Sequence, residues 1–251
     1  MSTPGASALR IVELYSHHLA VNGDMGNTLV LAERARLAGL ATVVTRYSPG
    51  DDIPEGADLV TMGSGPLSAL VAVSPDVERL GRAVRDWAAA GVPMLFVGAG
   101  YQLAGDCVTG LEEPLAGLGV FHQTTDVTSP RAVTASFLVE TTFGRLVGVE
   151  NHGSTTVLTA GQQPFGMALT GRGNGPGHDE GARTNEAIGT HLHGPVLAMN
   201  PVLADHMLRM AVVRRGLAYE TTREHDRLDG LAAATRELLE RGARLGAGRA
   251  S

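Results

Sequence analysis

The sequence predicts an α/β fold in which a mostly parallel sheet is covered by helices on both faces. In the first hundred residues, apolar runs typical of strands alternate with amphipathic segments typical of helices. The joints between these segments are short and rich in glycine. The run VPMLFV at residues 92–97 is apolar throughout, as expected for a parallel strand that is buried on both faces.

The predicted elements of this first half follow one another in order. Strands are expected at residues 9–14, 41–47, 58–62 and 92–97, and helices at residues 26–39 and 77–90 and directly after residue 98. Glycines at the ends of the two longer helices are typical stop signals. Because parallel strands end at the same edge of a sheet, the Gly-rich joints at 63–65 and 98–100 are predicted to lie where ligands bind.

The second half is predicted to contain short strands and two more helices. Strands are expected within residues 121–140 and at 146–149, 155–158, 165–169 and 187–192, a loop at 171–181, and helices at 200–215 and 222–244. We find no internal repeat and no interdomain linker. We therefore predict one domain over residues 9–215 and a C-terminal helical extension or tail over 216–251, with disorder expected from 246 to 251.

Composition limits the classes of function. A chain of 251 residues, 43% of them hydrophobic, can bury a sizeable core. A net charge of -6 without a long basic run argues against nucleic acid as the main partner. No apolar stretch reaches the roughly 18 residues of a membrane span, and residues 1–10 lack the apolar centre of a signal peptide, so we expect a cytoplasmic protein. The single cysteine, Cys107, excludes an internal disulfide and a cysteine-based zinc site.

The joint after Val97 has the pattern of a nucleophile elbow that lacks a nucleophile. A buried strand that turns sharply into a helix exposes the turn residue at the sheet edge, beside free backbone N–H groups. Such a turn requires small residues, and Gly98-Ala99-Gly100 supplies them. Taken alone, the pattern also fits an ordinary Gly-rich joint between a strand and a helix, so both interpretations stay open here.

Two other polar motifs are candidates for a site. His193 follows a predicted strand and precedes Gly-Pro, where it is either a general base or a structural or surface histidine. His191 is expected on the same strand face, which makes a His-x-His metal pair conceivable, but no convincing third ligand is found and no metal site is predicted. Residues 150–153, Glu-Asn-His-Gly, are predicted to form a turn between two short strands that either binds a ligand or only closes the turn.

The order of the motifs along the chain resembles one family. The motifs are Gly-Asp-x-Gly-Asn at 23–27, the Gly-rich loop at 63–65, the elbow with Tyr-Gln at 98–102, Gly-Val-Glu-Asn-His-Gly at 148–153 and Gly-Thr-His-Leu-His-Gly-Pro at 189–195. Together they resemble the cobyric-acid-synthase-type branch of class I glutamine amidotransferases, and within it the glutaminase subunits of lipid II isoglutaminyl synthases. The resemblance runs from about residue 9 to residue 213 and implies a flavodoxin-like three-layer sandwich.

The resemblance also implies a reaction and a partner. In this family a cysteine thiolate at the elbow attacks the side-chain amide of glutamine, a histidine moves the proton, and backbone N–H groups stabilise the oxyanion. The ammonia passes to a Mur-ligase-like subunit of the same hetero-oligomer, which uses ATP to amidate the glutamate of lipid II. The resemblance implies glutamine or another small polar molecule as ligand, and we expect no nucleic acid, no cofactor and no metal on this chain.

The resemblance assigns a role to each matching position. His193 matches the catalytic histidine, and Gly98 marks the position of the lost nucleophile. The residues that match the oxyanion-hole region are Ser64, Gly65 and Ala99, and those that match substrate-binding positions are Gln102, Arg131, Asn151 and His152.

Two departures from the family pattern change the expected function. The family reads Cys-Gly-Gly-Tyr-Gln where residues 98–102 read Gly-Ala-Gly-Tyr-Gln, and Gly-Gly-Gly-Gln-Asp where residues 63–67 read Gly-Ser-Gly-Pro-Leu. Glycine cannot form a thioester, and Cys107, placed on the helix expected after Gly98, would lie about 13 Å away. We therefore expect a glutaminase-inactive amidotransferase-like subunit. The alternatives are an active glutaminase or amidotransferase and a pseudoenzyme that binds another small molecule.

Overall fold

The central feature of the fold is a six-stranded sheet, seen in a computed structural model that describes residues 8–159 and 161–247. In spatial order its strands are β13 (Ala182–Thr184), β14 (Ala187–Thr190), β4 (Met94–Val97), β3 (Leu59–Met62), β1 (Leu9–Leu14) and β2 (Thr42–Tyr47). All neighbours pair in parallel except β13 and β14, which are antiparallel. The predicted mostly parallel sheet is therefore confirmed.

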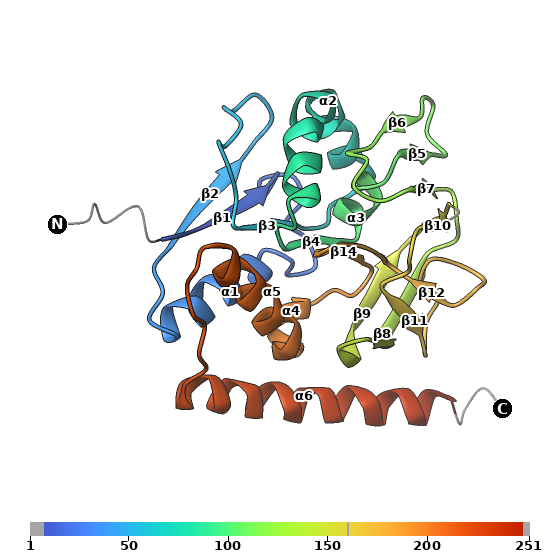
Figure 1. The fold of residues 1–251 in the computed structure, drawn as a ribbon. Coiled ribbons are helices and arrows are strands. Elements are labelled where there is room, and N and C mark those ends of the chain that lie inside the picture. The colour runs from blue at the N-terminus through green and yellow to red at the C-terminus, as the bar shows by residue number, and fades with distance from the viewer. Residues whose placement is uncertain (1–7, 160, 248–251) are drawn as a thin grey trace.

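Helices cover both faces of this sheet (Figure 1). One face packs against α2 (Leu67–Ala89) and α3 (Ala99–Leu103), and the other against α1 (Gly26–Leu37), α4 (Val196–Met199) and α5 (Pro201–Arg214). Strand β4 shows why residues 92–97 are apolar throughout. Its alternate side chains enter the two cores in turn, Met94 and Phe96 on one face and Leu95 and Val97 on the other.

Helix α2 begins ten residues before the predicted start at residue 77. The expected start is wrong because the helix continues through Pro75. Proline has no N–H to donate to the carbonyl four residues earlier, which here belongs to Val71. The Ser74 hydroxyl donates to that carbonyl instead, at 3.0 Å. This local bond satisfies the Val71 carbonyl and lets the helix extend back to Leu67, directly beside the 63–65 loop.

Two smaller sheets stand at one end of the central sheet (Figure 1). The first contains β10 (Thr155–Leu158), β7 (Gln123–Asp126), β5 (Cys107–Thr109) and β6 (Leu115–Ala116). The second contains β12 (Asp179–Glu180), β11 (Gly166–Ala168), β8 (Ala132–Thr141) and β9 (Gly144–His152). The sequence did not predict β5, β6, β12, β13 or α4, since segments of two to four residues show no measurable periodicity.

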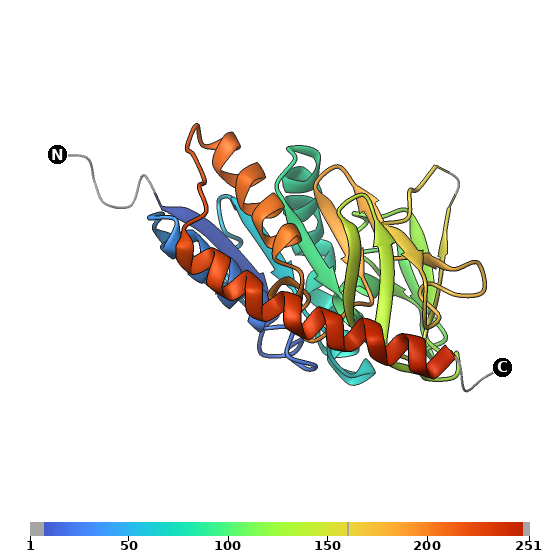
Figure 2. The ribbon, with the colours of Figure 1, turned by 90° about the horizontal axis from the view of Figure 1, so that it is seen from below.

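The C-terminal helix α6 (Arg223–Ala247) lies across the body of the protein, from α1 and α4 to β8 and β9 (Figures 1 and 2). Arg34 of α1, only 4% exposed, donates to Asp205 of α5 at 2.8 Å and to Asp229 of α6 at 2.6 Å. The helix expected from residue 222 is thus present, and residues 248–251 of the expected disordered end lie outside the described part. Within 8–159 and 161–247, no helix combines the length and apolarity that crossing a membrane requires.

Candidate active site

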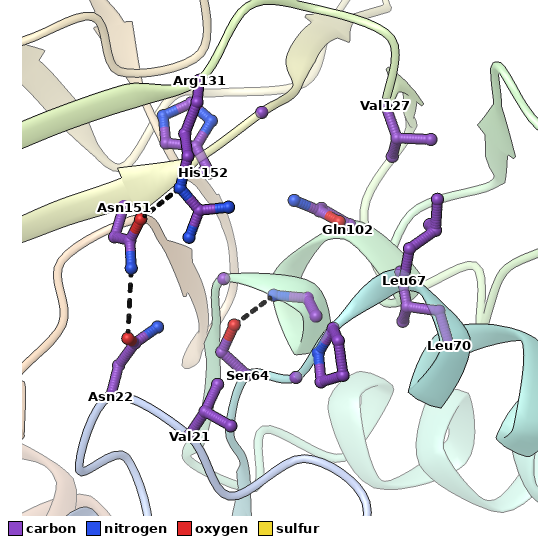
Figure 3. A pocket seen from close by; sticks show the side chains of 15 residues that line it. Val21, Asn22, Ser64, Leu67, Leu70, Gln102, Val127, Arg131, Asn151 and His152 are labelled. Atoms are coloured by element: carbon purple, nitrogen blue, oxygen red, sulfur yellow. Dashed lines mark hydrogen bonds between the residues drawn. The ribbon is translucent and has the colours of Figure 1, made fainter.

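A cavity of about 490 Å³ opens where β3 and β4 end, at the edge predicted for a ligand (Figure 3). Its walls come from the 63–67 loop, the start of α3, the end of β9 and the loop that follows β7. The predicted site residues that line it are Ser64, Gly65, Gly98, Ala99, Gln102, Arg131, Asn151 and His152. The remaining predicted residue, His193, is not part of the lining and lies behind Gly98.

The joint after β4 has the backbone geometry of a nucleophile elbow. Gly98 has φ 55° and ψ -114°, a conformation that residues with a side chain rarely adopt. Helix α3 begins at the next residue, and the Gly100 N–H donates to the Gly63 carbonyl at 3.0 Å. A Cβ on Gly100 would lie only 2.6 Å from that carbonyl oxygen, so glycine is required there. The elbow and the 63–65 loop are therefore in direct backbone contact.

The space beside Gly98 is already occupied. A Cβ on Gly98 would lie 2.5 Å from Ser64 Oγ and 2.5 Å from His193 Cε1, both closer than such atoms approach in proteins. Ser64 is 5% exposed, and its Oγ accepts a hydrogen bond from the Ala99 N–H at 3.1 Å. The serine side chain thus fills the place where a side chain on residue 98 would begin.

His193 has the surroundings of a catalytic histidine. It is 1% exposed, and its Nδ1 lies 3.0 Å from Asp24 Oδ2. A carboxylate can only accept, so Nδ1 carries the proton and Nε2 carries the lone pair of a potential base. Nε2 has no hydrogen-bond partner within residues 8–159 and 161–247. The histidine is therefore oriented by Asp24, while its basic nitrogen is left unused.

Asp24 is a candidate site residue to which the sequence pattern assigned no role. Its motif, Gly-Asp-x-Gly-Asn at residues 23–27, contributed to the resemblance without an assigned role. The structure shows that this motif holds the histidine loop: a Cβ on Gly26 would lie 2.6 Å from Pro195, and Asn27 Oδ1 accepts from the Leu197 N–H at 3.0 Å. The sequence did offer a signal for Asp24, because this aspartate belongs to one of the motifs that carry the family resemblance.

The opposite wall is formed by the end of β9, and the predicted turn at residues 150–153 is wrong. Residues 150–152 are strand, because they pair with residues 132–134 of β8. Glu150 is 0% exposed and accepts hydrogen bonds from Thr134 Oγ1 at 2.7 Å and from the Gly173 N–H at 2.8 Å. Burial alone would raise the pKa of Glu150, but hydrogen bonds from His152, Thr134 and two backbone amides outweigh it and hold the pKa below its usual value.

His191 and His193, which were expected on the same strand face, have different surroundings. His193 pairs with Asp24, whereas His191 stacks on His152 with ring centroids 3.8 Å apart. Burial, reinforced by His152 and His193, lowers the pKa of His191 far below its ordinary value, so this ring is neutral. Beside it, burial raises the pKa of Glu180 to about 7, although Glu180 accepts hydrogen bonds from Thr190 and the His191 N–H.

Polar side chains continue along one rim of the cavity (Figure 3). Arg131 Nε donates to Asn151 Oδ1 at 2.9 Å, and Asn151 Nδ2 donates to Asn22 Oδ1 at 3.3 Å. Gln102, on α3, donates to Ser154 at 3.1 Å. The cavity therefore combines an exposed guanidinium group with amide groups, which suits a small ligand that carries a carboxylate.

Cys107 is not part of the cavity lining. The prediction that it lies on a helix continuing from Gly98 is wrong, because α3 ends at Leu103 and Cys107 belongs to strand β5. There it pairs with Thr124 of β7 and Ala116 of β6. The thiol is thus fixed in a different sheet from the elbow.

Comparison with known proteins agrees with this geometry. Residues 28–201 match the CobB/CobQ-like glutamine amidotransferase domain. The chain is 29% identical over 216 residues to the lipid II isoglutaminyl synthase (glutamine-hydrolyzing) subunit GatD of Staphylococcus aureus, covering 84% of this chain and 88% of the relative. To the subunit of the same name from Streptococcus pneumoniae it is 28% identical over 212 residues, covering 82% of each.

The fold is also found in solved structures. A crystal structure of a glutamine amidotransferase superposes with a TM-score of 0.52 at 18% sequence identity, covering 80% of this chain and 98% of that one. At this identity the similarity shows the fold alone, which is that of class I glutamine amidotransferases. Together with the match over residues 28–201, it shows that this chain belongs to the CobB/CobQ-like glutamine amidotransferase family.

Proposed function

We propose that this chain is the amidotransferase-like subunit of a hetero-oligomer with a Mur-ligase-like, ATP-dependent partner, and that it does not hydrolyse glutamine through a thiolate. The proposed process is amidation of the lipid II glutamate during cell-wall synthesis, in the cytoplasm. Support comes from two relatives that are named as subunits of lipid II isoglutaminyl synthase and that match most of this chain.

One observation is the main support for the proposal that this chain does not use a thiolate. The residue at the elbow is Gly98, and the space that a side chain would need there is taken by Ser64 and His193. Cys107, the only cysteine, lies in β5 outside the cavity lining. A thioester cannot form without a sulfur atom at the elbow, whatever the state of His193.

The retained scaffold supports a role in the complex. The histidine loop, the elbow turn and the β9 wall are each held by buried contacts in a chain that has no nucleophile at the elbow. In this proposal the subunit stabilises its ligase-like partner, and the partner takes ammonium from solution as its nitrogen source.

The test is co-expression of the full chain with the candidate ligase-like subunit of the same organism. The purified complex is assayed for amidation of lipid II with ATP and either glutamine or ammonium chloride. We expect co-purification, product with ammonium chloride, and no glutamate released from glutamine. Glutamate release by the unmodified complex above the level of the partner alone would refute the non-hydrolysing role.

A second candidate function, binding of a small molecule without hydrolysis, is favoured by the intact cavity rim. Arg131 and Asn151 are hydrogen-bonded side by side at its entrance and do not require a nucleophile for binding (Figure 3). Titration with L-glutamine tests it by calorimetry. We expect Arg131→Ala to weaken binding at least tenfold, and Arg145→Ala, an exposed arginine of β9 outside the cavity lining, to leave it unchanged. Equal affinity in both variants would contradict this role for Arg131.

A further inference from the structure

Two of the positions that depart from the family pattern, Ser64 and Gly98, face each other across the elbow. The family pattern described above has glycine in the loop and cysteine at the elbow, whereas this chain has Ser64 in the loop and Gly98 at the elbow. We infer that Ser64 and Gly98 are an exchanged pair: the side chain is on residue 64 in place of residue 98. The serine side chain fills the space of the nucleophile, and its Oγ accepts the hydrogen bond of the Ala99 N–H. This inference rests on the proposed non-hydrolysing role and explains how the site is closed.

The first part of the inference concerns space. Ser64 Oγ lies 2.5 Å and Ser64 Cβ 2.9 Å from the position of a Cβ on Gly98. Contacts this short force one of the two residues to move. Ser64 has little room to do so, because its carbonyl accepts from the Val21 N–H at 2.9 Å and its side chain is buried. A side chain on residue 98 therefore needs a smaller residue at position 64, in addition to a shift of the His193 ring, whose Cε1 lies 2.5 Å from the same Cβ position.

The second part concerns the oxyanion donor. In acyl transfer the backbone N–H after the nucleophile stabilises the negative charge that develops on the substrate oxygen. Here that donor is the Ala99 N–H, and it already donates to Ser64 Oγ at 3.1 Å. A substrate oxygen would have to displace the serine hydroxyl first. Restoring a thiol at residue 98 therefore leaves the Ala99 N–H, the donor that directly follows the nucleophile, engaged as long as Ser64 is present.

Ser64 is better placed to block the site than to act as a nucleophile itself. A nucleophilic serine needs its base within hydrogen-bond reach. His193 Nε2 has no hydrogen-bond partner within the part of the chain that the structure describes, so it does not engage Ser64. The hydroxyl oxygen of Ser64 instead accepts from the amide that an oxyanion would use.

The experiment compares thiol reactivity in full-length chains that carry Cys107→Ser, so that residue 98 provides the sole thiol. Gly98→Cys is compared with the double variant Ser64→Gly/Gly98→Cys by intact mass after treatment with acivicin, a glutamine analogue that alkylates activated thiols. We expect the double variant to react at least tenfold faster. Iodoacetamide labelling of the unfolded chains confirms that both carry one thiol. Alkylation is the readout because turnover would also depend on Pro66 and Leu67.

Each outcome decides the inference separately from the proposed function. Equal acivicin rates in the two variants overturn the exchanged pair, even if the unmodified chain releases no glutamate. Labelling of the unmodified chain at Ser64 by a fluorophosphonate also overturns it, because the serine would then be a nucleophile. If Gly98→Cys does not fold, the refolding yields of the two variants are compared instead of the acivicin rates. A higher yield for Ser64→Gly/Gly98→Cys supports the exchanged pair, and an equally low yield for both variants overturns it. Glutamate release by the unmodified complex contradicts the proposed function alone.

Discussion

The two sides of the cavity differ in how they are held together. The elbow side depends on one strained glycine and one serine hydroxyl, Gly98 and Ser64. The β9 side depends on a buried hydrogen-bond network centred on Glu150. This network joins β9 to β8 and to the loop at residues 172–173. Chemistry at the elbow therefore depends on very few atoms, whereas the β9 wall is part of the fold itself.

This difference changes what the retained residues mean. Glu150 and His152 are buried and hydrogen-bonded to each other at 3.1 Å, so stability alone is a sufficient reason for their presence. Arg131 is exposed at the cavity rim, where a side chain contributes little to folding. Retention of the β9 wall is thus weak evidence for a ligand, and the rim carries the information about binding. Four predictions separate the two sides.

The largest effect is expected on the β9 side. Glu150→Ala leaves Thr134 Oγ1 and the Gly173 N–H without their buried acceptor, and we expect a loss of about 3–5 kcal/mol in the free energy of unfolding. Denaturant unfolding measures it. Glu150→Gln, which keeps one acceptor oxygen, serves as the control and should lose about half as much. A loss below about 1 kcal/mol for Glu150→Ala would show that the network is not structural.

The next effect is a pH dependence that originates beside His191. Burial raises the folded pKa of Glu180 from 4.5 to about 7. Below about pH 4.5 the folded and unfolded chains both hold the proton, and between that value and about 7 only the folded chain does. Stability from this group is therefore complete at low pH and falls by roughly 3 kcal/mol as the pH rises to about 7.

The variant Glu180→Gln isolates this group from the other titrating side chains. It keeps an oxygen acceptor for Thr190 and the His191 N–H but cannot ionise. The difference in unfolding free energy between the parent and the variant should shift with pH over the window from about 4.5 to 7 and stay constant above it. A difference that does not change with pH would mean that Glu180 titrates normally.

A smaller effect is expected at the elbow. Gly98→Ala adds a Cβ at φ 55° and in contact with Ser64, and should cost about 2–3 kcal/mol. In a Ser64→Gly background the same substitution should cost at least about 1 kcal/mol less, with the remainder due to backbone strain and to the contact with His193. The double-mutant cycle is measured by denaturant unfolding, and strict additivity would argue that the two residues do not compete for space.

The smallest effect is expected at the rim. Arg131→Ala should change the free energy of unfolding by less than about 0.5 kcal/mol, because the side chain is exposed and its bond to Asn151 lies at the cavity entrance. The same denaturant unfolding measurement applies. A loss of about 2 kcal/mol or more in the free energy of unfolding would show that Arg131 belongs to the structural network of the β9 side. The wall and the rim would then not differ in their contribution to stability.

Most of the central sheet could be predicted from the sequence, and the smaller elements could not. Strands β1, β2, β3 and β4 lie within one or two residues of their predicted ranges, because apolar and β-branched runs mark strands even where, as in β2, most side chains are exposed. Residues 150–152 were misassigned because their strand pairing depends on β8, which lies earlier in the chain. The start of α2 was missed because a serine hydroxyl replaces the hydrogen bond that Pro75 removes.

The sequence by itself determined which chemistry is missing. One cysteine in the whole chain, at position 107, and a glycine at the elbow exclude a thiolate at residue 98 without any coordinates. Only the tertiary structure decided what took its place. Asp24 and His193 are 169 residues apart in the chain, and Ser64 meets the Ala99 amide across 35 residues. Such contacts are set by how β1, β3, β4 and β14 align their carboxyl ends, and no local pattern in the sequence records that alignment.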